Sequence, residues 1–399
     1  MRDPSPLPFA AKPVARLERP SVEALAARRH AGPAVLTGCL DAWPLYRALR
    51  GLPTPEAKLA HLSARVGHRE VTYSVAAAND GQFGLDADLE RPNFALDAVG
   101  PVRFDAAAQA LARGDGDRVV YLQAKAVAAQ FPELLPELGP LDYLDRLDVF
   151  NEGRRTFTRP YWVLWIGSGG QVVNLHYDPG FNFICLLEGR KRVVLFPPSA
   201  LADLYHGAYD RGLASVPMSL VRLLEPDHAR FPRLRAALAE AVTADLSPGE
   251  VLYVPPLWWH HVESYGVNIM ANAWVDEVHW ESVVGFIEHA VAVFAGAREP
   301  ARRRAAEACR ARIFGAAPGY APTLDAAEAA RLDALAPERL ASRLPRHWRD
   351  YVARALDHFA FRLGGDPFPP LPGAFARWVK RIRARERRIA AGWEASHPK

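Results

Sequence analysis

The chain has 399 residues, of which 50% are hydrophobic, 10% aromatic and 24% charged. This is the composition of a folded protein with a large core, and it excludes an intrinsically disordered chain. No uncharged apolar stretch approaches the roughly 18 residues that a membrane helix needs, so we expect no membrane-spanning segment. The formal net charge of +4 is too small to indicate a class of partner.

The first residues mix charges and prolines where a secretory signal would need an apolar run of about 7 to 15 residues, which predicts a cytoplasmic location. Three cysteines, Cys39, Cys185 and Cys309, show no CxxC spacing, and their odd number cannot be fully paired within one chain. We therefore expect reduced thiols.

Short strands and helices alternate over residues 1–150. Ser21 is a plausible N-cap of a helix that follows it. Apolar and β-branched runs predict strands at 33–37, 70–74 and 118–122, and an alanine- and leucine-rich run predicts a helix at 105–113. This region is expected to be an α/β lead-in.

Aromatic and β-branched runs dominate residues 151–280. They predict strands at 161–166, 181–187, 192–196, 251–254 and 267–274, separated by glycine and proline turns. One turn, at Glu188–Gly189, is expected to close a hairpin. The pattern is typical of antiparallel strands that close into a barrel or sandwich. Helical segments follow at 282–295, 301–314 and 347–363, within a C-terminal region that spans 281–399.

Two separated motifs indicate a metal site. His176 and Asp178 lie two residues apart at the edge of a strand, so alternation sends both side chains to one face. An HxD pair alone is common by chance. A second strand, however, places His260 after a Pro-Pro break, where it would neighbour His176 in a rolled antiparallel sheet. Two histidines and a carboxylate form the facial triad that holds non-haem Fe(II) and leaves coordination positions open.

Lys191 follows the Glu188–Gly189 turn in a run of basic residues. Taken alone, it reads as a solvated cation beside Arg190 and Arg192. Beside the triad, we expect it to project into the barrel. A buried ammonium is costly unless an anion neutralises it, so an inward Lys191 implies a carboxylate ligand.

The region from about 30 to 280 resembles the JmjC branch of the Fe(II)- and 2-oxoglutarate-dependent dioxygenases, and within it the asparaginyl hydroxylases that act on hypoxia-inducible factor. The likeness is carried by His176-Tyr-Asp178, by Trp258-Trp-His260-His-Val-Glu-Ser and by Glu-Gly-Arg-Lys191-Arg-Val-Val-Leu-Phe-Pro-Pro. It implies a mainly β core, a double-stranded β-helix (jelly-roll or cupin), with an α/β N-terminal elaboration and a helical C-terminal region.

The resemblance also implies roles for single residues. His176, Asp178 and His260 would bind the iron, and 2-oxoglutarate would chelate it while its far carboxylate meets Lys191 and Tyr121. Asn182 and Asn272 fall where family members contact the cosubstrate, and Gln123 falls where a substrate contact is expected. Val173 departs from the family, which often has Thr or Ser three residues before the first histidine, so one hydrogen bond to the cosubstrate is missing there.

The implied reaction is hydroxylation of a protein or peptide side chain, with succinate and carbon dioxide as co-products. Three alternatives stay open: the same chemistry on a tRNA base or small metabolite, demethylation of methyl-lysine, and a metal-binding cupin that is no oxygenase. His261 is expected to point away from His260 and to be structural.

The C-terminal region carries two features that bear on partners. Residues 377–388 hold seven basic side chains and one acidic one on an expected helix, which could attract nucleic acid, although a solvated helix is the favoured reading. Residues 347–363 carry an apolar stripe at helical spacing. Because related enzymes often dimerise through C-terminal helices, we expect a homodimer.

Overall fold

The computed structural model describes residues 5–28, 31–77, 82–83, 98–114, 118–146, 149, 161–178, 181–197, 200, 203–204, 218–219, 221–255 and 258–275. The chain divides into two compact units, and the first, Met1–Ala200 with Met218–His279, contains nearly all of these residues. The predicted C-terminal helices, the basic segment and the dimer helix lie outside the described part. Among the described helices, none is long and apolar enough to cross a membrane.

Strands dominate the described residues. They are β1 (Lys12–Pro13), β2 (Ala15–Glu18), β3 (Ala34–Thr37), β4 (Glu70–Ala77), β5 (Gln82–Phe83), β6 (Ala98–Arg103), β7 (Arg118–Ala126), β8 (Tyr161–Gly167), β9 (Val172–Tyr177), β10 (Phe181–Phe196), β11 (Val242–Leu246), β12 (Val251–Val254) and β13 (Trp259–Val275). The helices are α1 (Val22–Ala27), α2 (Pro44–Arg50), α3 (Pro55–Val66), α4 (Phe104–Arg113), α5 (Val127–Gln130), the 3-10 helix η1 (Pro132–Glu137), α6 (Asp142–Asp145) and α8 (Leu234–Leu238).

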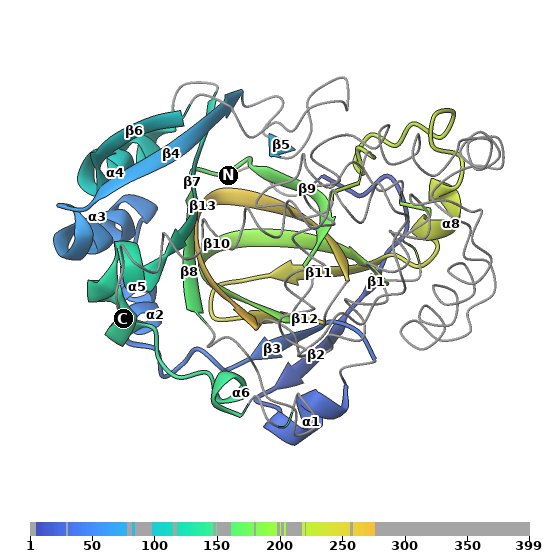
Figure 1. Cartoon of the computed structure of the whole chain (residues 1–399), viewed down its shortest axis with the longest axis horizontal. Coiled ribbons are helices and arrows are strands. Elements are labelled where there is room, and N and C mark those ends of the chain that lie inside the picture. The colour runs from blue at the N-terminus through green and yellow to red at the C-terminus, as the bar shows by residue number, and fades with distance from the viewer. Residues whose placement is uncertain are drawn as a thin grey trace, which may run out of the picture. The chain divides into compact units, whose positions relative to one another are not determined.

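Two long antiparallel strands, β10 and β13, form the central ribbon of the fold (Figure 1). The first half of β10 and the last half of β13 are flanked by β12 and β8, which extend one layer to β3 and β7. The other halves are flanked by β11 and β9. One ribbon thus contributes to both layers, as in a double-stranded β-helix, and the predicted mainly β, cupin-like fold is confirmed.

The predicted hairpin at Glu188–Gly189 is wrong. β10 runs without reversal from Phe181 to Phe196 and pairs with β13 along its whole length, with register shifts on both sides of Glu188. Gly189 has φ +85°, and a Cβ there would lie 2.6 Å from Val267 O, so glycine serves a bulge where the sequence pattern suggested a turn. The two residue numbers of a pair sum to 456 before the bulge (Leu186 with Met270) and to 455 after it (Lys191 with Ser264). The odd difference means that the two strands have unequal numbers of residues across the bulge. The bulge therefore exchanges the face on which alternate side chains of β10 lie.

This exchange brings Asn182 and Lys191 to the same interior face of the barrel. They are nine residues apart, an odd number, so an unbroken strand would direct them to opposite faces. In the structure both are buried, at 4% and 2% exposure, and both bond to side chains of β13 or of the β9–β10 connection. The bulge is therefore what allows one strand to serve both ends of the site.

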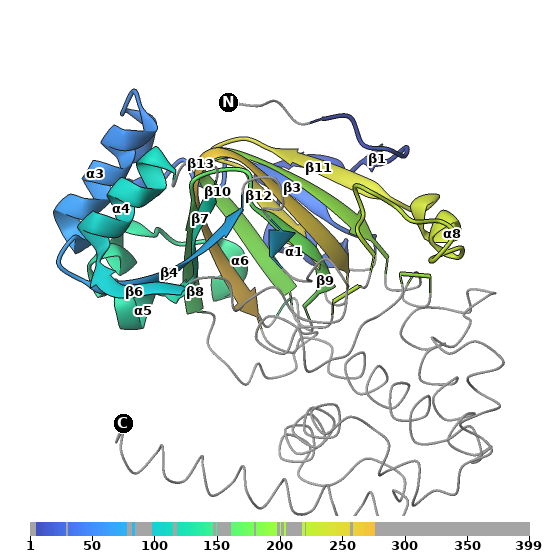
Figure 2. The same cartoon turned by 90° about the horizontal axis from the view of Figure 1, so that it is seen from above.

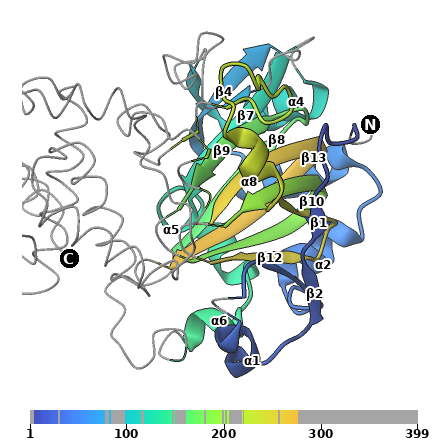
Figure 3. The same ribbon diagram turned by 90° about the vertical axis from the view of Figure 1, so that its right-hand side faces the viewer.

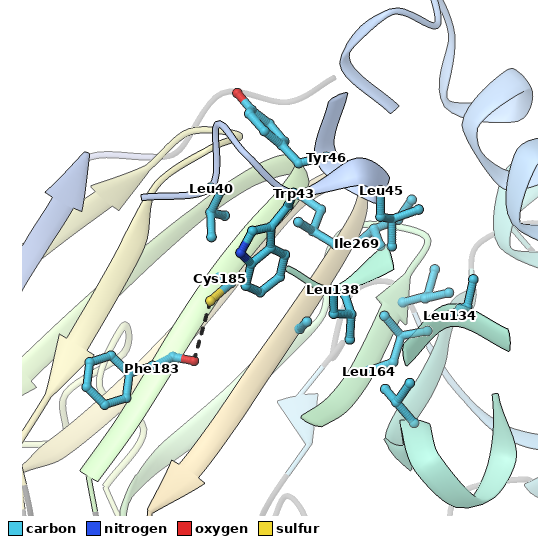
Figure 4. Packing of buried hydrophobic residues seen from close by; sticks show 14 of the residues in the cluster. Leu40, Trp43, Leu45, Tyr46, Leu134, Leu138, Leu164, Phe183, Cys185 and Ile269 are labelled. Atoms are coloured by element: carbon cyan, nitrogen blue, oxygen red, sulfur yellow. Dashed lines mark hydrogen bonds between the residues drawn. The ribbon is translucent and has the colours of Figure 1, made fainter. Parts of the chain in front are cut away.

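The N-terminal helices cover the outer face of the layer that contains β12 and β8. Figure 2 shows α3, α4 and α5 gathered beside β7 and β8. Trp43, fully buried just before α2, packs edge-on against Trp162 at a ring-centroid distance of 5.0 Å and donates from Nε1 to Pro140 O at 3.0 Å. Figure 4 shows its indole beside Cys185 of β10, among the leucines of the core.

Several local predictions in this region are confirmed. Ser21 caps α1, because its Oγ accepts from the Ala24 amide at 3.1 Å. The predicted strands at 33–37, 70–74 and 118–122 are β3, β4 and β7, and the helix at 105–113 is α4. α1 and α6 lie side by side in Figures 1 and 3, and Tyr143 of α6 donates to Pro20 O just before α1 at 2.7 Å.

Candidate metal centre

Three side chains converge inside the barrel from neighbouring elements. His176 lies in β9, Asp178 directly follows that strand, and His260 lies in β13, where it pairs with His176 in the sheet register. One potential ligand atom from each lies within 4.8 Å of the other two. The imidazole centroids of His176 and His260 are 4.1 Å apart, and His260 Nε2 lies 3.5 Å from Asp178 Oδ2. As predicted, the two histidine strands are neighbours.

Both imidazoles are oriented by the backbone in the same way. His176 Nδ1 lies 2.7 Å from Asn174 O, and His260 Nδ1 lies 3.0 Å from Trp258 O. A carbonyl only accepts, so each Nδ1 carries a proton, which leaves Nε2 as the ring nitrogen available to a metal. Burial, followed by the nearby His260, lowers the pKa of His176, which keeps its ring neutral at pH 7.

The donor set fits a divalent transition metal. Two imidazole nitrogens and one carboxylate oxygen face each other in a buried site, with His260 Nε2 3.5 Å from Asp178 Oδ2. A buried carboxylate is unfavourable unless a cation pairs with it. Two histidines and one carboxylate suit non-haem Fe(II), with positions left for other ligands.

The carboxylate of Asp178 receives two N–H donors on one oxygen. Asn182 Nδ2 and Trp274 Nε1 each lie 2.9 Å from Asp178 Oδ2. Behind them, Asn272 Nδ2 donates to Asn182 Oδ1 at 3.0 Å, and Trp165 Nε1 donates to Asn272 Oδ1 at 2.7 Å. Asn182 and Asn272 therefore lie beside the metal ligands and bond to each other; their contact with a cosubstrate stays a prediction.

Lys191 lies buried on the same interior face, in a pocket of neutral polar groups. Its Nζ donates to Ser264 Oγ at 2.6 Å and to Asn268 Oδ1 at 3.1 Å. Asn268 Oδ1 also accepts from Gln171 Nε2 at 2.9 Å. Because these partners carry no charge, burial lowers the pKa of Lys191 to about 7. The ammonium therefore stands in a site that a carboxylate would stabilise.

Tyr121 contacts the ring of Trp165 beside this interior, while Gln123 and Val173 lie on β7 and β9. Tyr121 of β7 is 2% exposed, its ring lies 5.9 Å from that of Trp165, and burial raises its pKa. Gln123, two residues along, is partly exposed beside a register shift in β7. Val173 of β9 pairs with Val262 and is half-buried. The roles predicted for Tyr121 and Gln123 stay predictions.

His261 lies outside the triad. It pairs with Val194 of β10, is 2% exposed, and its two ring nitrogens have no hydrogen-bond partner among the described residues. Burial and the nearby His176 lower its pKa to about 3, so the ring is neutral. This agrees with the structural role expected for it.

Four residues of the interior, Ser264, Asn268, Trp165 and Gln171, were not predicted from the sequence. Ser264 and Asn268 follow His260 by four and eight residues, so strand alternation alone would have placed them on its face. The hydrogen-bond roles of Trp165 and Gln171 carry no such signal, because they depend on which strands pair across the barrel.

Comparison with known proteins places the chain among cupin-like proteins. The family model described as "Cupin-like domain" matches residues 23–279. The human HSPB1-associated protein 1 is 44% identical over 116 residues, which are 29% of this chain and 23% of that protein. The human "Bifunctional peptidase and (3S)-lysyl hydroxylase JMJD7" is 26% identical over 274 residues, 61% of this chain and 77% of that protein. The Arabidopsis thaliana "Lysine-specific demethylase JMJ31" is 35% identical over 118 residues, 30% of this chain and 20% of that protein.

The match to HSPB1-associated protein 1 spans less than a quarter of that protein's length, so the comparison speaks for the shared domain. The family model, by contrast, covers more than half of this chain and includes strands β3 to β13 and all three converging side chains. The chain belongs to the cupin-like domain family, and the proteins similar to it include a JmjC domain-containing protein.

Proposed function

We propose that this protein is an Fe(II)- and 2-oxoglutarate-dependent oxygenase that hydroxylates a side chain of a protein or peptide. The observation that carries the proposal is the pairing of a two-histidine, one-carboxylate centre with a buried, uncompensated lysine on the same interior face. A lone metal site would suit many cupins. A metal site that shares its barrel with a cationic pocket suits a cosubstrate with an acid at each end.

The residues of the chain divide the work between the two ends of the site. His176 and His260 would each bind the metal through Nε2, and Asp178 would bind it through a carboxylate oxygen. Lys191 would pair with the far carboxylate of 2-oxoglutarate, with Ser264 beside it as the hydroxyl that Val173 does not supply. Tyr121 would add a hydrogen bond from strand β7, which lies next to β8 in the sheet.

Iron with its cosubstrate supplies the oxygen-activating chemistry, and the chain orients the reactants around it. Asn182 and Asn272 would border the cosubstrate beside the metal, and Gln123 would meet the substrate. The hydrogen bonds from Nδ1 of both histidines to backbone carbonyls would keep each Nε2 oriented toward the metal. Buried aromatic and aliphatic side chains exclude water from the barrel.

A protein substrate is supported by what the relatives are named for: JMJD7 is a lysyl hydroxylase and JMJ31 a lysine demethylase by name. We also propose that the enzyme is cytoplasmic. The basic C-terminal segment, which would favour nucleic acid, and the helix expected to form a dimer stay predictions.

The test is an anaerobic absorbance titration of the purified chain with Fe(II) and then 2-oxoglutarate. A metal-to-cosubstrate charge-transfer band is expected for the wild type. His176→Ala should abolish it. Lys191→Met should keep metal binding but require about ten to a hundred times more 2-oxoglutarate, because a charge-assisted pair in a buried site contributes about 1.5–3 kcal/mol. Exposed Lys12→Met is the matched control and should titrate like the wild type.

Metal binding without the band would favour the metal-binding cupin that is no oxygenase. If the band forms, peptides are then incubated with the enzyme, 2-oxoglutarate and oxygen. Mass spectrometry should find the gain of one oxygen atom on a side chain together with succinate. Loss of a methyl group from methyl-lysine peptides would assign demethylation instead, and turnover only with tRNA or small metabolites would exclude a protein substrate.

A further inference from the structure

The hydrogen bonds behind Asp178 form a chain with a single allowed direction. It runs from Trp165 to Asn272, to Asn182 and to Asp178, while Trp274 reaches the same carboxylate oxygen directly. An indole N–H donates and cannot accept. We name these four side chains behind the carboxylate, Trp165, Asn272, Asn182 and Trp274, the indole–amide relay.

Trp165 determines how both asparagine amides are turned. Since its Nε1 can only donate, Asn272 must present Oδ1 to it at 2.7 Å and has Nδ2 left to donate. Asn182 must then accept through Oδ1 and donate through Nδ2 to Asp178. The carboxylate oxygen at the other end only accepts, so both ends of the chain require the same orientation of the amides, and loss of Trp165 frees the Asn272 amide to turn.

The relay delivers two N–H donors to a single oxygen, Asp178 Oδ2. The same oxygen lies 3.5 Å from His260 Nε2, so the donors act on the oxygen that faces a metal-binding histidine. We propose that Trp165 and Trp274 are positioning residues of the metal centre, which fix the orientation of the Asp178 carboxylate relative to His176 and His260. This inference rests on the metal site of the proposed function.

The position of these residues supports a role beyond packing. Trp274 pairs with Asn182 across β10 and β13, and Ile184 pairs with Asn272, so the relay follows the sheet register. Trp165 is 8% exposed, and its ring meets that of Trp274 edge-on at 6.2 Å. Trp162, three residues earlier in β8, packs instead against Trp43, just before α2. Among the described residues, it makes no hydrogen bond to the relay. It provides a matched tryptophan in the same strand.

The experiment uses Co(II) alone, with the full chain, and needs no turnover. Affinity is measured by competition with a chromophoric chelator, and the d–d absorption spectrum reports the coordination number. Trp274→Phe and Trp165→Phe should each weaken Co(II) binding by about tenfold, as is typical when a group that orients a metal ligand is removed. Both should alter the spectrum, because the Asp178 carboxylate loses a hydrogen bond that fixes its orientation. Trp162→Phe should leave affinity and spectrum unchanged.

A double-mutant cycle separates the relay from simple packing. In an Asn182→Ala background, Trp165→Phe should cause no further loss, because the link through which it acts is already cut. Trp274→Phe should still cost its full factor there, since it reaches Asp178 directly. If Trp165→Phe is unfolded, Asn272→Ala interrupts the relay at the next link and carries the same expectation.

The two proposals fail in different ways. Wild type that does not bind Co(II) would overturn the metal site, and the relay with it. Wild type that binds Co(II), with Trp165→Phe indistinguishable from Trp162→Phe, would overturn the relay and leave the metal site standing. An equal loss from Trp165→Phe with and without Asn182 would also refute it.

Discussion

Replacing Lys191 with methionine should make the metal-free protein more stable at pH 7. Burial lowers the pKa of Lys191 from 10.5 to about 7. At pH 7 the unfolded chain binds a proton here that the folded chain holds only half of the time, which costs folding about 4 kcal/mol. The substitution removes this cost but leaves Ser264 Oγ and Asn268 Oδ1 without a donor, at about 1–3 kcal/mol. The expected net gain is about 1–3 kcal/mol.

The pH dependence gives the sharper test. Between pH 7 and 10.5 the unfolded state binds more protons at this site than the folded state, so the stability of the wild type rises with pH. The cost at Lys191 shrinks to about 1 kcal/mol at pH 10. Urea unfolding at both pH values should therefore show the advantage of Lys191→Met falling by about 3 kcal/mol. Lys12→Met serves as the exposed control.

Two results would refute this reasoning: a stability difference that does not change with pH, or a variant less stable than the wild type at pH 7. Saturating 2-oxoglutarate should reverse the order at pH 7. A ligand at a hundred times its Kd stabilises the wild type by about 2.7 kcal/mol, and the variant should gain far less. The lysine would then destabilise the fold without ligand and stabilise the fold with 2-oxoglutarate bound.

Two further substitutions test the fold that positions the site. Gly189→Ala should destabilise the protein by about 2–4 kcal/mol in urea unfolding, because φ is +85° and the new Cβ would lie 2.7 Å from Asn268 Cβ. Gly114→Ala, also at positive φ but with no atom within 4 Å, should cost only about 1–2 kcal/mol, and equal losses would argue against the bulge clash. Trp43→Ala should cost about 3–5 kcal/mol, since the indole is fully buried; a loss below about 1 kcal/mol would show that it does not hold the helical layer.

The sequence predicted what depends on local pattern. Alternation along 174–178 and the Pro-Pro break before His260 were enough to predict neighbouring histidine strands, and the register bears this out. The bulge at Gly189 could not be distinguished from a turn, because both conformations call for a glycine at positive φ. Whether the chain reverses there is decided by β13, a strand about 80 residues away, which pairs with β10 on both sides of the glycine.

The hydrogen bonds around Asp178 lay beyond the sequence for a related reason. The sequence leaves two readings of Trp274 open, a wall of the site or a packed barrel aromatic, and the register then places it opposite Asn182. Its indole nitrogen finds Asp178 only because three elements meet at that point. Local pattern gives the residue types of a site, whereas strand pairing decides which of them touch.

The continuous pairing of β10 with β13 also restricts how this chain can change length. A residue inserted between Phe181 and Leu186 would turn the side chains that follow it, Lys191 among them, to the opposite face. One inserted between Lys191 and Phe196 would change which residues of β10 pair with the strand segment around His260. Only the irregular stretch around Glu188 and its partner segment already accommodates unequal numbers of residues on the two strands. Descendants of this sequence should therefore gain and lose residues at that point or in the connecting loops, while the spacing from Lys191 to Phe196 stays constant.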